Sequence, residues 1–302
     1  MSGTIRLATR KSALALAQSR QVARRLEALE PGLQVEEVQV VTQGDRVQDR
    51  PLSEIGGKGL FVAEIEAALA EGRADLAVHS MKDLPAALAE GMVLAAVPTR
   101  ASPWDLLITR DGANLEALPQ GAHVGTSSQR RALQLHALRR DLRISMLRGN
   151  IDTRLRRLEE GAFDAIVLAE AGVSRLGVTV RGVRLAGRLV PAVGQGALAL
   201  ECRADDAYAC RVVGLLDDAV TRRETDAERA LMRALGGSCT VPLGAHAVWG
   251  ADGADMAMEG FYAREDGAQA RATVTGDGRT EADAAALGAA LGAKLRAAVG
   301  LA

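Results

Sequence analysis

Aromatic residues are scarce in this chain of 302 residues, which contains three phenylalanines, two tryptophans and two tyrosines. Few rings are therefore available to stack on nucleic-acid bases. The formal net charge is −1 at pH 7, so no overall positive field would draw the protein to a polyanion. Together these observations argue against a nucleic-acid-binding module.

Cysteine is also rare, with three residues and no CxxC spacing. This odd number argues against both a disulfide framework and a zinc site. The four histidines are scattered, and none has the spacing of metal ligands. We therefore expect no metal centre, and we expect a reducing cytoplasm as the location of the protein.

Long apolar runs are absent, since none approaches the roughly 18 residues of a membrane span. The first residues lead directly into an expected strand without an apolar secretory segment. We therefore expect a cytoplasmic protein with no membrane partner. The sequence also lacks a GxGxxG motif, a Walker A loop and a serine in a nucleophile elbow.

What the sequence has is the composition of an ordinary globular protein, with 48% hydrophobic and 25% charged residues. Its length is sufficient for two or three domains. The first hundred residues alternate strand and helix, which is typical of a parallel sheet with ligands at the carboxyl ends of its strands. The elements expected there are strands at 5–9, 35–41 and 74–80 and helices after Ser12 and over 60–71.

A second α/β unit follows, and residues 189–196 resemble a crossover that returns the chain to the first unit. A third region begins near residue 220 with a helix, two strands and a closing alanine-rich helix. We therefore expect a discontinuous first domain. The expected boundaries are 1–98 plus 197–216 for domain 1, 104–190 for domain 2 and 219–302 for domain 3.

Polar side chains cluster where the expected strands end. The turn formed by Thr126, Ser127 and Ser128 opens a helix, so its free N–H groups and hydroxyls predict an anion site. Neighbouring arginines can bind carboxylates in bidentate fashion. Four such segments predict a cleft for a polyanionic small molecule, and they are 8–12, 79–83, 125–131 and 148–154.

Two residues stand out from this set. Asp83 is a lone carboxylate among cations, which could stabilise a cationic intermediate or relay protons; a salt bridge to Lys82 or a helix cap would also explain it. Two glycines and a serine precede Cys239, and a Val-Pro pair follows shortly after it. This pattern indicates a thiol at the tip of a turn. An ordinary loop thiol has the same pattern.

Five motifs occur together and in order: 79–85, 125–131, 147–150, 191–196 and the Cys239 loop. With them, the chain closely resembles the porphobilinogen deaminases, also called hydroxymethylbilane synthases, over nearly its full length. One difference is that a serine separates the two glycines from Cys239, where many relatives place the glycines directly before the cysteine.

The resemblance implies an α/β fold of three domains. The first two would be type II periplasmic-binding-protein-like domains with mixed, mainly parallel sheets, and the third a small α/β domain with an antiparallel sheet. It also implies a monomeric transferase of tetrapyrrole biosynthesis. Four porphobilinogen molecules would be condensed head to tail onto a dipyrromethane cofactor held by Cys239, and hydrolysis would then release linear hydroxymethylbilane.

The same resemblance implies roles for individual residues. Asp83 would be the catalytic aspartate, Cys239 the attachment point of the cofactor, and the polar loop 44–58 a lid. The residues expected to bind the carboxylates of cofactor and substrate are Arg10, Ser12, Lys58, Ser80, Lys82, Thr126, Ser127, Ser128, Arg130, Arg131, Arg148, Gly149, Arg154, Arg175 and Gln195. The alternative is a cytoplasmic solute-binding protein of the same hinged fold for a polycarboxylate ligand, with neither fixed thiol nor catalytic acid.

Overall fold

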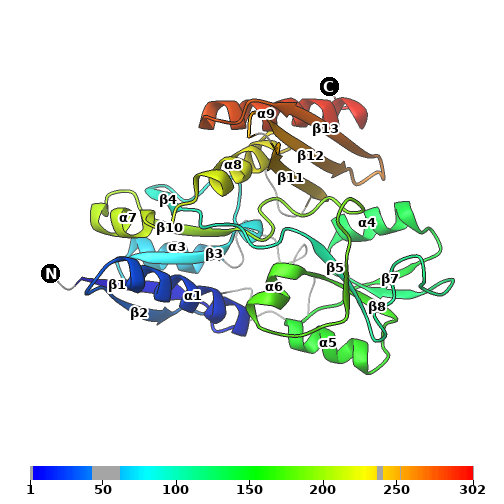
Figure 1. The fold of residues 1–302 in the computed structure, drawn as a ribbon, viewed down its shortest axis with the longest axis horizontal. Helices are drawn as coiled ribbons and strands as arrows, with labels where there is room; N and C mark the ends of the chain where they lie inside the picture. The colour runs from blue at the N-terminus through cyan, green and yellow to red at the C-terminus, as the bar shows by residue number, and fades with distance from the viewer. Residues whose placement is uncertain (1–2, 43–61, 237–240, 252, 302) are drawn as a thin grey trace.

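The structure is a computed structural model that describes residues 3–42, 62–236, 241–251 and 253–301. Two five-stranded sheets lie side by side in Figure 1, and a three-stranded sheet with two long helices lies above them. In this part of the chain no helix is long and apolar enough to cross a membrane.

The first sheet has the order β2-β1-β3-β10-β4. Its strands are β1 (Thr4–Thr9), β2 (Gln34–Gln39), β3 (Leu76–Ser80), β4 (Met92–Ala96) and β10 (Leu198–Arg203). Helices α1 (Ala13–Leu29) and α7 (Ala207–Gly214) cover one face, and α3 (Ala63–Ala70) covers the other. Consecutive residues of β1 point to opposite faces, so both layers are apolar.

The second sheet repeats this pattern with the order β7-β6-β8-β5-β9. Its strands are β5 (Asp105–Thr109), β6 (His123–Gly125), β7 (Arg143–Ser145), β8 (Ala165–Ala169) and β9 (Gly182–Arg184). Helix α4 (Gln129–Leu138) packs on one face, and α5 (Ile151–Glu159) and α6 (Glu170–Arg175) pack on the other.

One strand in each of these sheets is reversed. β10 is antiparallel to both β3 and β4, and β5 is antiparallel to both β8 and β9. Each reversed strand follows a crossover from the other sheet, and it runs in the direction opposite to its two neighbours. The parallel pairing expected from the first hundred residues is found between β1, β2 and β3, and the reversed strand of that sheet, β10, comes from a later part of the chain. The mixed sheets implied by the resemblance are confirmed.

The third sheet is an antiparallel meander of β11 (Leu243–Trp249), β12 (Met256–Ala263) and β13 (Gln269–Gly276). Helices α8 (Ala219–Ala234) and α9 (Glu281–Ala298) pack together on one face of this sheet. A capping box at Thr280 and Asp283 starts α9. The expected fold class, two mixed α/β sheets and a small α/β unit with an antiparallel sheet, is confirmed.

Candidate functional site

The polar segments of the first sheet come together because β1 and β3 are parallel neighbours whose carboxyl ends share one edge. Arg10 follows β1, and Ser12 caps helix α1 by accepting from Ala15 N at 3.4 Å. Ser80 ends β3, and its Oγ accepts a hydrogen bond from Gln18 Nε2 at 2.8 Å. Ser12 and Ser80 thus hold local structure at this edge.

Asp83 lies directly after β3, in a short 3-10 turn over Met81–Asp83. Its side chain is exposed, and no hydrogen bond or ion pair to it occurs among the described residues, so neither the Lys82 salt bridge nor the helix cap is found. Lys82 is half-buried, and burial lowers its pKa although the charge of Asp83 opposes this. His79 is buried and contacts Glu201 Oε2 at 2.8 Å, as expected of a core histidine.

In the second sheet, the hydroxyl-rich turn after β6 is tied into the local backbone. Ser128 Oγ accepts from Arg131 N at 3.4 Å and caps α4, while Thr126 Oγ1 accepts from Ser128 N at 3.2 Å. Ser127 Oγ donates to Leu147 O at 2.5 Å. The turn therefore opens a helix as predicted, with each hydroxyl engaged in shaping it.

Arg130 and Arg131 are buried, with only 5% and 6% of their surface exposed, although both were predicted to bind ligand carboxylates. Arg130 Nη2 donates to Asp105 Oδ2, and Arg131 Nη2 donates to Asp105 Oδ1, both at 2.8 Å. Burial alone would raise the pKa of Asp105, but the two guanidinium charges outweigh it and hold this pKa well below its usual range. Asp105 at the start of β5 is the counter-ion that sequence reasoning missed.

Gln195 completes this buried network from the second crossover. Its Nε2 donates to Asp105 Oδ1 at 2.8 Å and to Pro103 O at 2.7 Å. The side chain is 1% exposed. Gln195 therefore joins the two crossovers to the second sheet, and its expected contact with a ligand stays a prediction.

Two further cations of the second sheet donate to carbonyl oxygens instead of a carboxylate. Arg154 Nε donates to Gly149 O at 2.7 Å, and Arg175 Nη2 donates to Gly196 O at 2.7 Å. Burial lowers the pKa of both arginines to about 10, and the charges of Arg131 and Arg148 add to the effect on Arg154. Each remains protonated at neutral pH, because a pKa near 10 is still well above 7.

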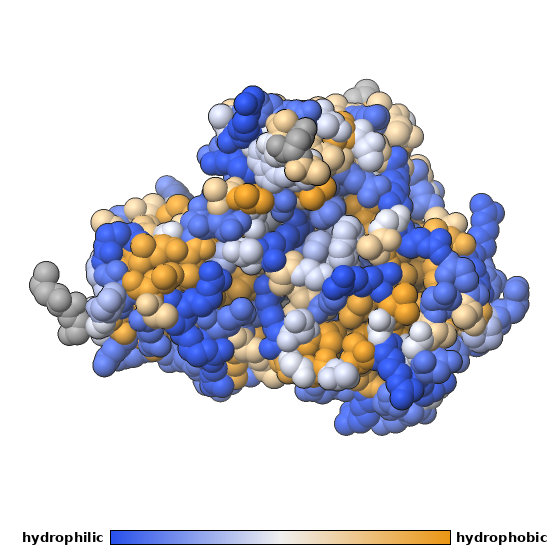
Figure 2. Space-filling model, viewed as in Figure 1, coloured by the Kyte–Doolittle hydropathy of each residue, from blue (hydrophilic) through white to orange (hydrophobic). Residues whose placement is uncertain are grey.

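Cations from both sheets lie near enough for their charges to act on one another. The charges of Arg130 and Arg131 on α4 contribute to the lowered pKa of Lys82, which follows β3. Arg131 and Arg148 act likewise on Arg154. The described residues thus include a group of interacting positive charges with Asp83 next to one of them, Lys82, and a ligand with several carboxylates requires such charges. Figure 2 shows hydrophilic surface between an apolar patch near α1 and α7 and another near α5 and α6.

Three predictions fall outside the described residues. Cys239, Lys58 and the loop 44–58 all lie in ranges about which the structure gives no information. Among the residues that are described, no cluster of histidine, cysteine, aspartate or glutamate could hold a metal ion.

Sequence reasoning also missed the ion pair that joins the three sheets. Arg100 of the first crossover donates from Nη1 to Glu228 Oε1 at 2.7 Å, and Glu228 Oε2 accepts from Gly194 N at 2.6 Å. Glu228 Oε1 also accepts from Ala247 N of β11 at 3.0 Å. The only signal for this residue in the sequence is one acidic position in an amphipathic helix, which usually indicates a solvated face.

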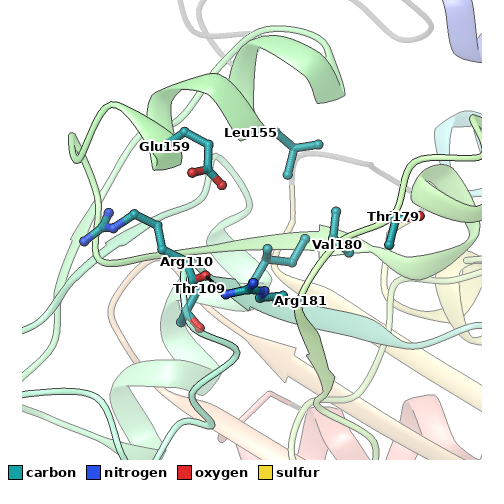
Figure 3. Close-up of a pocket in the computed structure, with 8 residues that line it drawn as sticks. Thr109, Arg110, Leu155, Glu159, Thr179, Val180 and Arg181 are labelled. Carbon is teal, nitrogen blue, oxygen red and sulfur yellow. Dashed lines mark hydrogen bonds between the residues drawn. The ribbon is translucent and has the colours of Figure 1, made fainter.

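A cavity in the second sheet lies away from this site (Figure 3). It is lined by Thr109, Arg110, Leu155, Glu159 and Arg181, among others. Thr109 is the last residue of β5 and Asp105 is the first. The cavity and the Arg131 cluster therefore lie at opposite ends of this strand. Its lining includes none of the residues predicted to bind a ligand.

The fold and the site define a class: an α/β protein with two mixed sheets and a third unit, in which positively charged side chains from both sheets lie near one another. Family models match nearly the whole chain. The porphobilinogen deaminase dipyrromethane cofactor binding domain matches residues 5–211, and the porphobilinogen deaminase C-terminal domain matches residues 223–297. The chain belongs to the porphobilinogen deaminase family.

Curated relatives agree with this assignment. The porphobilinogen deaminase of Sorangium cellulosum is 50% identical over 301 residues, covering 98% of this chain and 99% of the relative. That of Roseiflexus sp. is 48% identical over 297 residues, covering 98% and 96%. Among solved structures, the periplasmic aliphatic sulphonate binding protein SsuA of Escherichia coli aligns at a TM-score of 0.39 and 15% identity, over 76% of this chain and 70% of that one. The family match does not favour the alternative of a solute-binding protein.

Proposed function

We propose that this chain is a hydroxymethylbilane synthase that condenses four porphobilinogen molecules head to tail and then releases the linear product by hydrolysis. The observation that carries the proposal is a set of cations whose charges act on one another, Lys82 from one lobe and Arg131 and Arg154 from the other, with the exposed Asp83 next to Lys82 in the chain. A growing chain of pyrroles, each with an acetate and a propionate, brings many carboxylates to such a site.

The donor set fits a dipyrromethane cofactor, whose four carboxylates need cationic partners. Arg154 and Arg175 donate to carbonyl oxygens among the described residues, so their charges are available to a ligand carboxylate. When bound, the dipyrromethane supplies the free α-carbon onto which the chain grows. We assign its attachment to Cys239, because a thioether holds a primer through every cycle whereas a salt bridge is reversible.

Asp83 is the catalytic carboxylate of the reaction in this proposal. Loss of ammonia from porphobilinogen breaks a C–N bond and leaves a cationic azafulvene. The carboxylate of Asp83 stabilises that charge and accepts hydrogen bonds from pyrrole N–H groups. After the new C–C bond forms, the α-proton leaves the attacking pyrrole, and we assign its acceptance to the carboxylate of Asp83.

The remaining residues bind and orient. Lys82, Arg148 and Arg154 pair with carboxylates, while Arg130, Arg131 and Gln195 hold the edge of the second sheet through Asp105. Residues 1–98 with 197–216, 104–190 and 219–302 form the three domains in this proposal. The protein acts as a monomer in the cytoplasm, with porphobilinogen as its substrate.

Intact-mass measurement tests this proposal. The purified protein should carry an adduct of two pyrrole units, which Cys239→Ser should lose together with activity. Asp83→Asn should keep the adduct, because Cys239 is unchanged. It should lose nearly all turnover of porphobilinogen, because the carboxylate is replaced by a neutral amide. Cys210→Ser, on helix α7 of the first sheet, is the matched control and should keep both. An unmodified but active protein would contradict the proposal.

A further inference from the structure

Arg229 of helix α8 reaches out of the third unit and holds the chain that follows Asp83. Its Nη2 donates to Pro85 O at 2.9 Å and to Ala86 O at 3.0 Å. Ala86 also packs against the apolar core of the third unit. The segment next to the aspartate is therefore fixed to a helix 144 positions further along the sequence.

Packing alone does not explain an arginine in this position. Arg229 is 5% exposed, it forms no ion pair within 4 Å among the described residues, and its Nη1 is buried without a partner there. Burying a charge in this way costs free energy, and an apolar side chain of similar volume would avoid that cost. What the guanidinium provides is a charged donor that reaches two backbone carbonyls at once.

The turn that carries Asp83 is held from its other sides as well. Met81 N donates to Ala197 O of the second crossover at 3.1 Å. Gly194 of the same crossover leaves room for Met81, since a Cβ there would lie 2.6 Å from Met81 Cγ. With Arg229 behind Pro85, the turn is fixed between the crossover and α8.

Helix α8 also leads to the cysteine segment. It ends at Ala234, and Cys239 follows five residues later. Arg229 precedes the helix end by five residues, about 8 Å along the axis at 1.5 Å per residue. One rigid helix thus connects the residue that holds the Asp83 segment with the chain that carries the thiol.

We propose that Arg229 is a positioning residue, which sets Asp83 relative to the Cys239-bound primer by tying the carbonyls of Pro85 and Ala86 to helix α8. The inference rests on the proposed function, since it assigns a purpose to that site's geometry. Arg229 touches neither substrate nor primer in this proposal. It acts only through the backbone that carries Asp83.

The test compares Arg229→Leu, Arg229→Lys and the control Arg233→Leu, which lies one turn further along α8 and is exposed. Arg229→Leu should retain the two-pyrrole adduct and lower kcat by about 10- to 100-fold with little change in KM, because misplacement of a reacting group by about 1 Å costs rate rather than binding. Arg229→Lys keeps the charge with a shorter reach and should recover part of kcat. Arg233→Leu should match the wild type.

Hydrogen exchange gives a readout that does not depend on activity. The amides of Met81 and Leu84 should exchange faster in Arg229→Leu than in the wild type and the control. Should Arg229→Leu fail to fold, Arg229→Lys decides alone, and unchanged kcat with unchanged exchange in it overturns the inference. A wild-type protein without adduct or turnover would instead overturn the proposed function, while the exchange comparison would still test the tether.

Discussion

At the scale of single residues, the arginines of the site fall into two kinds. Arg130 and Arg131 share the single carboxylate of Asp105, so this buried trio balances one of its two positive charges internally. Arg154, Arg175 and the buried Arg229 donate to carbonyl oxygens, which leaves each with a net positive charge. Of the second kind, Arg154 and Arg175 are the ones proposed to attract ligand carboxylates, because a carbonyl satisfies a donor without cancelling its charge.

Glu224 on α8 allows a test of how burial changes the pKa of a single carboxyl group. Burial raises the pKa of Glu224 to about 7, because the Arg100 guanidinium 3.9 Å away does not compensate for the lost hydration and the nearby Glu228 opposes ionisation. The folded state therefore holds its proton more tightly than the unfolded chain, and stability falls as pH rises between about 4.5 and 7.

Glu224→Gln should remove this pH dependence. We expect a gain of about 1–3 kcal/mol in the free energy of unfolding at pH 8 and less than about 1 kcal/mol at pH 5. Urea-induced unfolding at the two pH values measures the difference. An equal effect at both values would show that Glu224 does not ionise within this range.

At the scale of elements, the helix starts and several strands were predictable from short-range signals. Ser12 and Ser128 cap α1 and α4 where the sequence indicates. β9 has only three residues, too short for a pattern, and β4, β5, β10 and β13 were not predicted. A strand such as β5, buried along its whole length, shows no alternation from which to recognise it.

Close packing of α8 and α9 depends on a glycine that no local pattern explains. A Cβ on Gly288 would lie 2.2 Å from Ala227 O of α8. Gly288→Ala should therefore destabilise the protein by about 1–3 kcal/mol, although alanine is the better helix former by about 1 kcal/mol. Thermal unfolding of the variant and the wild type shows whether the substitution lowers or raises stability.

The matched control for this substitution is Gly214→Ala at the end of α7. A Cβ on Gly214 would have no neighbouring atom within 4 Å among the described residues, so the added methyl group meets open space. This variant should be neutral or slightly stabilised. If both alanine variants were stabilised alike, the close helix contact would be excluded.

At the scale of the whole molecule, the two crossovers and α8 meet at Glu228. Its fully buried carboxylate accepts from Arg100, from Gly194 N and from Ala247 N, and so connects all three sheets. Glu228→Gln removes the nearer counter-charge of the Arg100 guanidinium, so that only Glu224, 3.9 Å away, remains. We expect a loss of about 3–5 kcal/mol in the free energy of unfolding.

Urea unfolding followed by the fluorescence of Trp104 and Trp249 measures this loss. Glu71→Gln is the control, because its ion pair with Arg73 has a similar length, 2.6 Å, but is exposed. That variant should lose less than about 1 kcal/mol. Equal losses in the two variants would mean that burial does not strengthen the junction.

The sequence by itself determined the family, the α/β alternation and the residues available at the strand ends, because motifs, caps and turns depend on neighbours in the chain. It marked Asp83 and the arginine segments but treated all the arginines alike. Only the tertiary structure decided that Asp105 pairs with both Arg130 and Arg131, that Glu228 joins the crossovers and that Arg229 holds the segment after Asp83. These pairings join residues from about 25 to about 145 positions apart, and which charge meets which is set by the reversed strands and crossovers that bring them together.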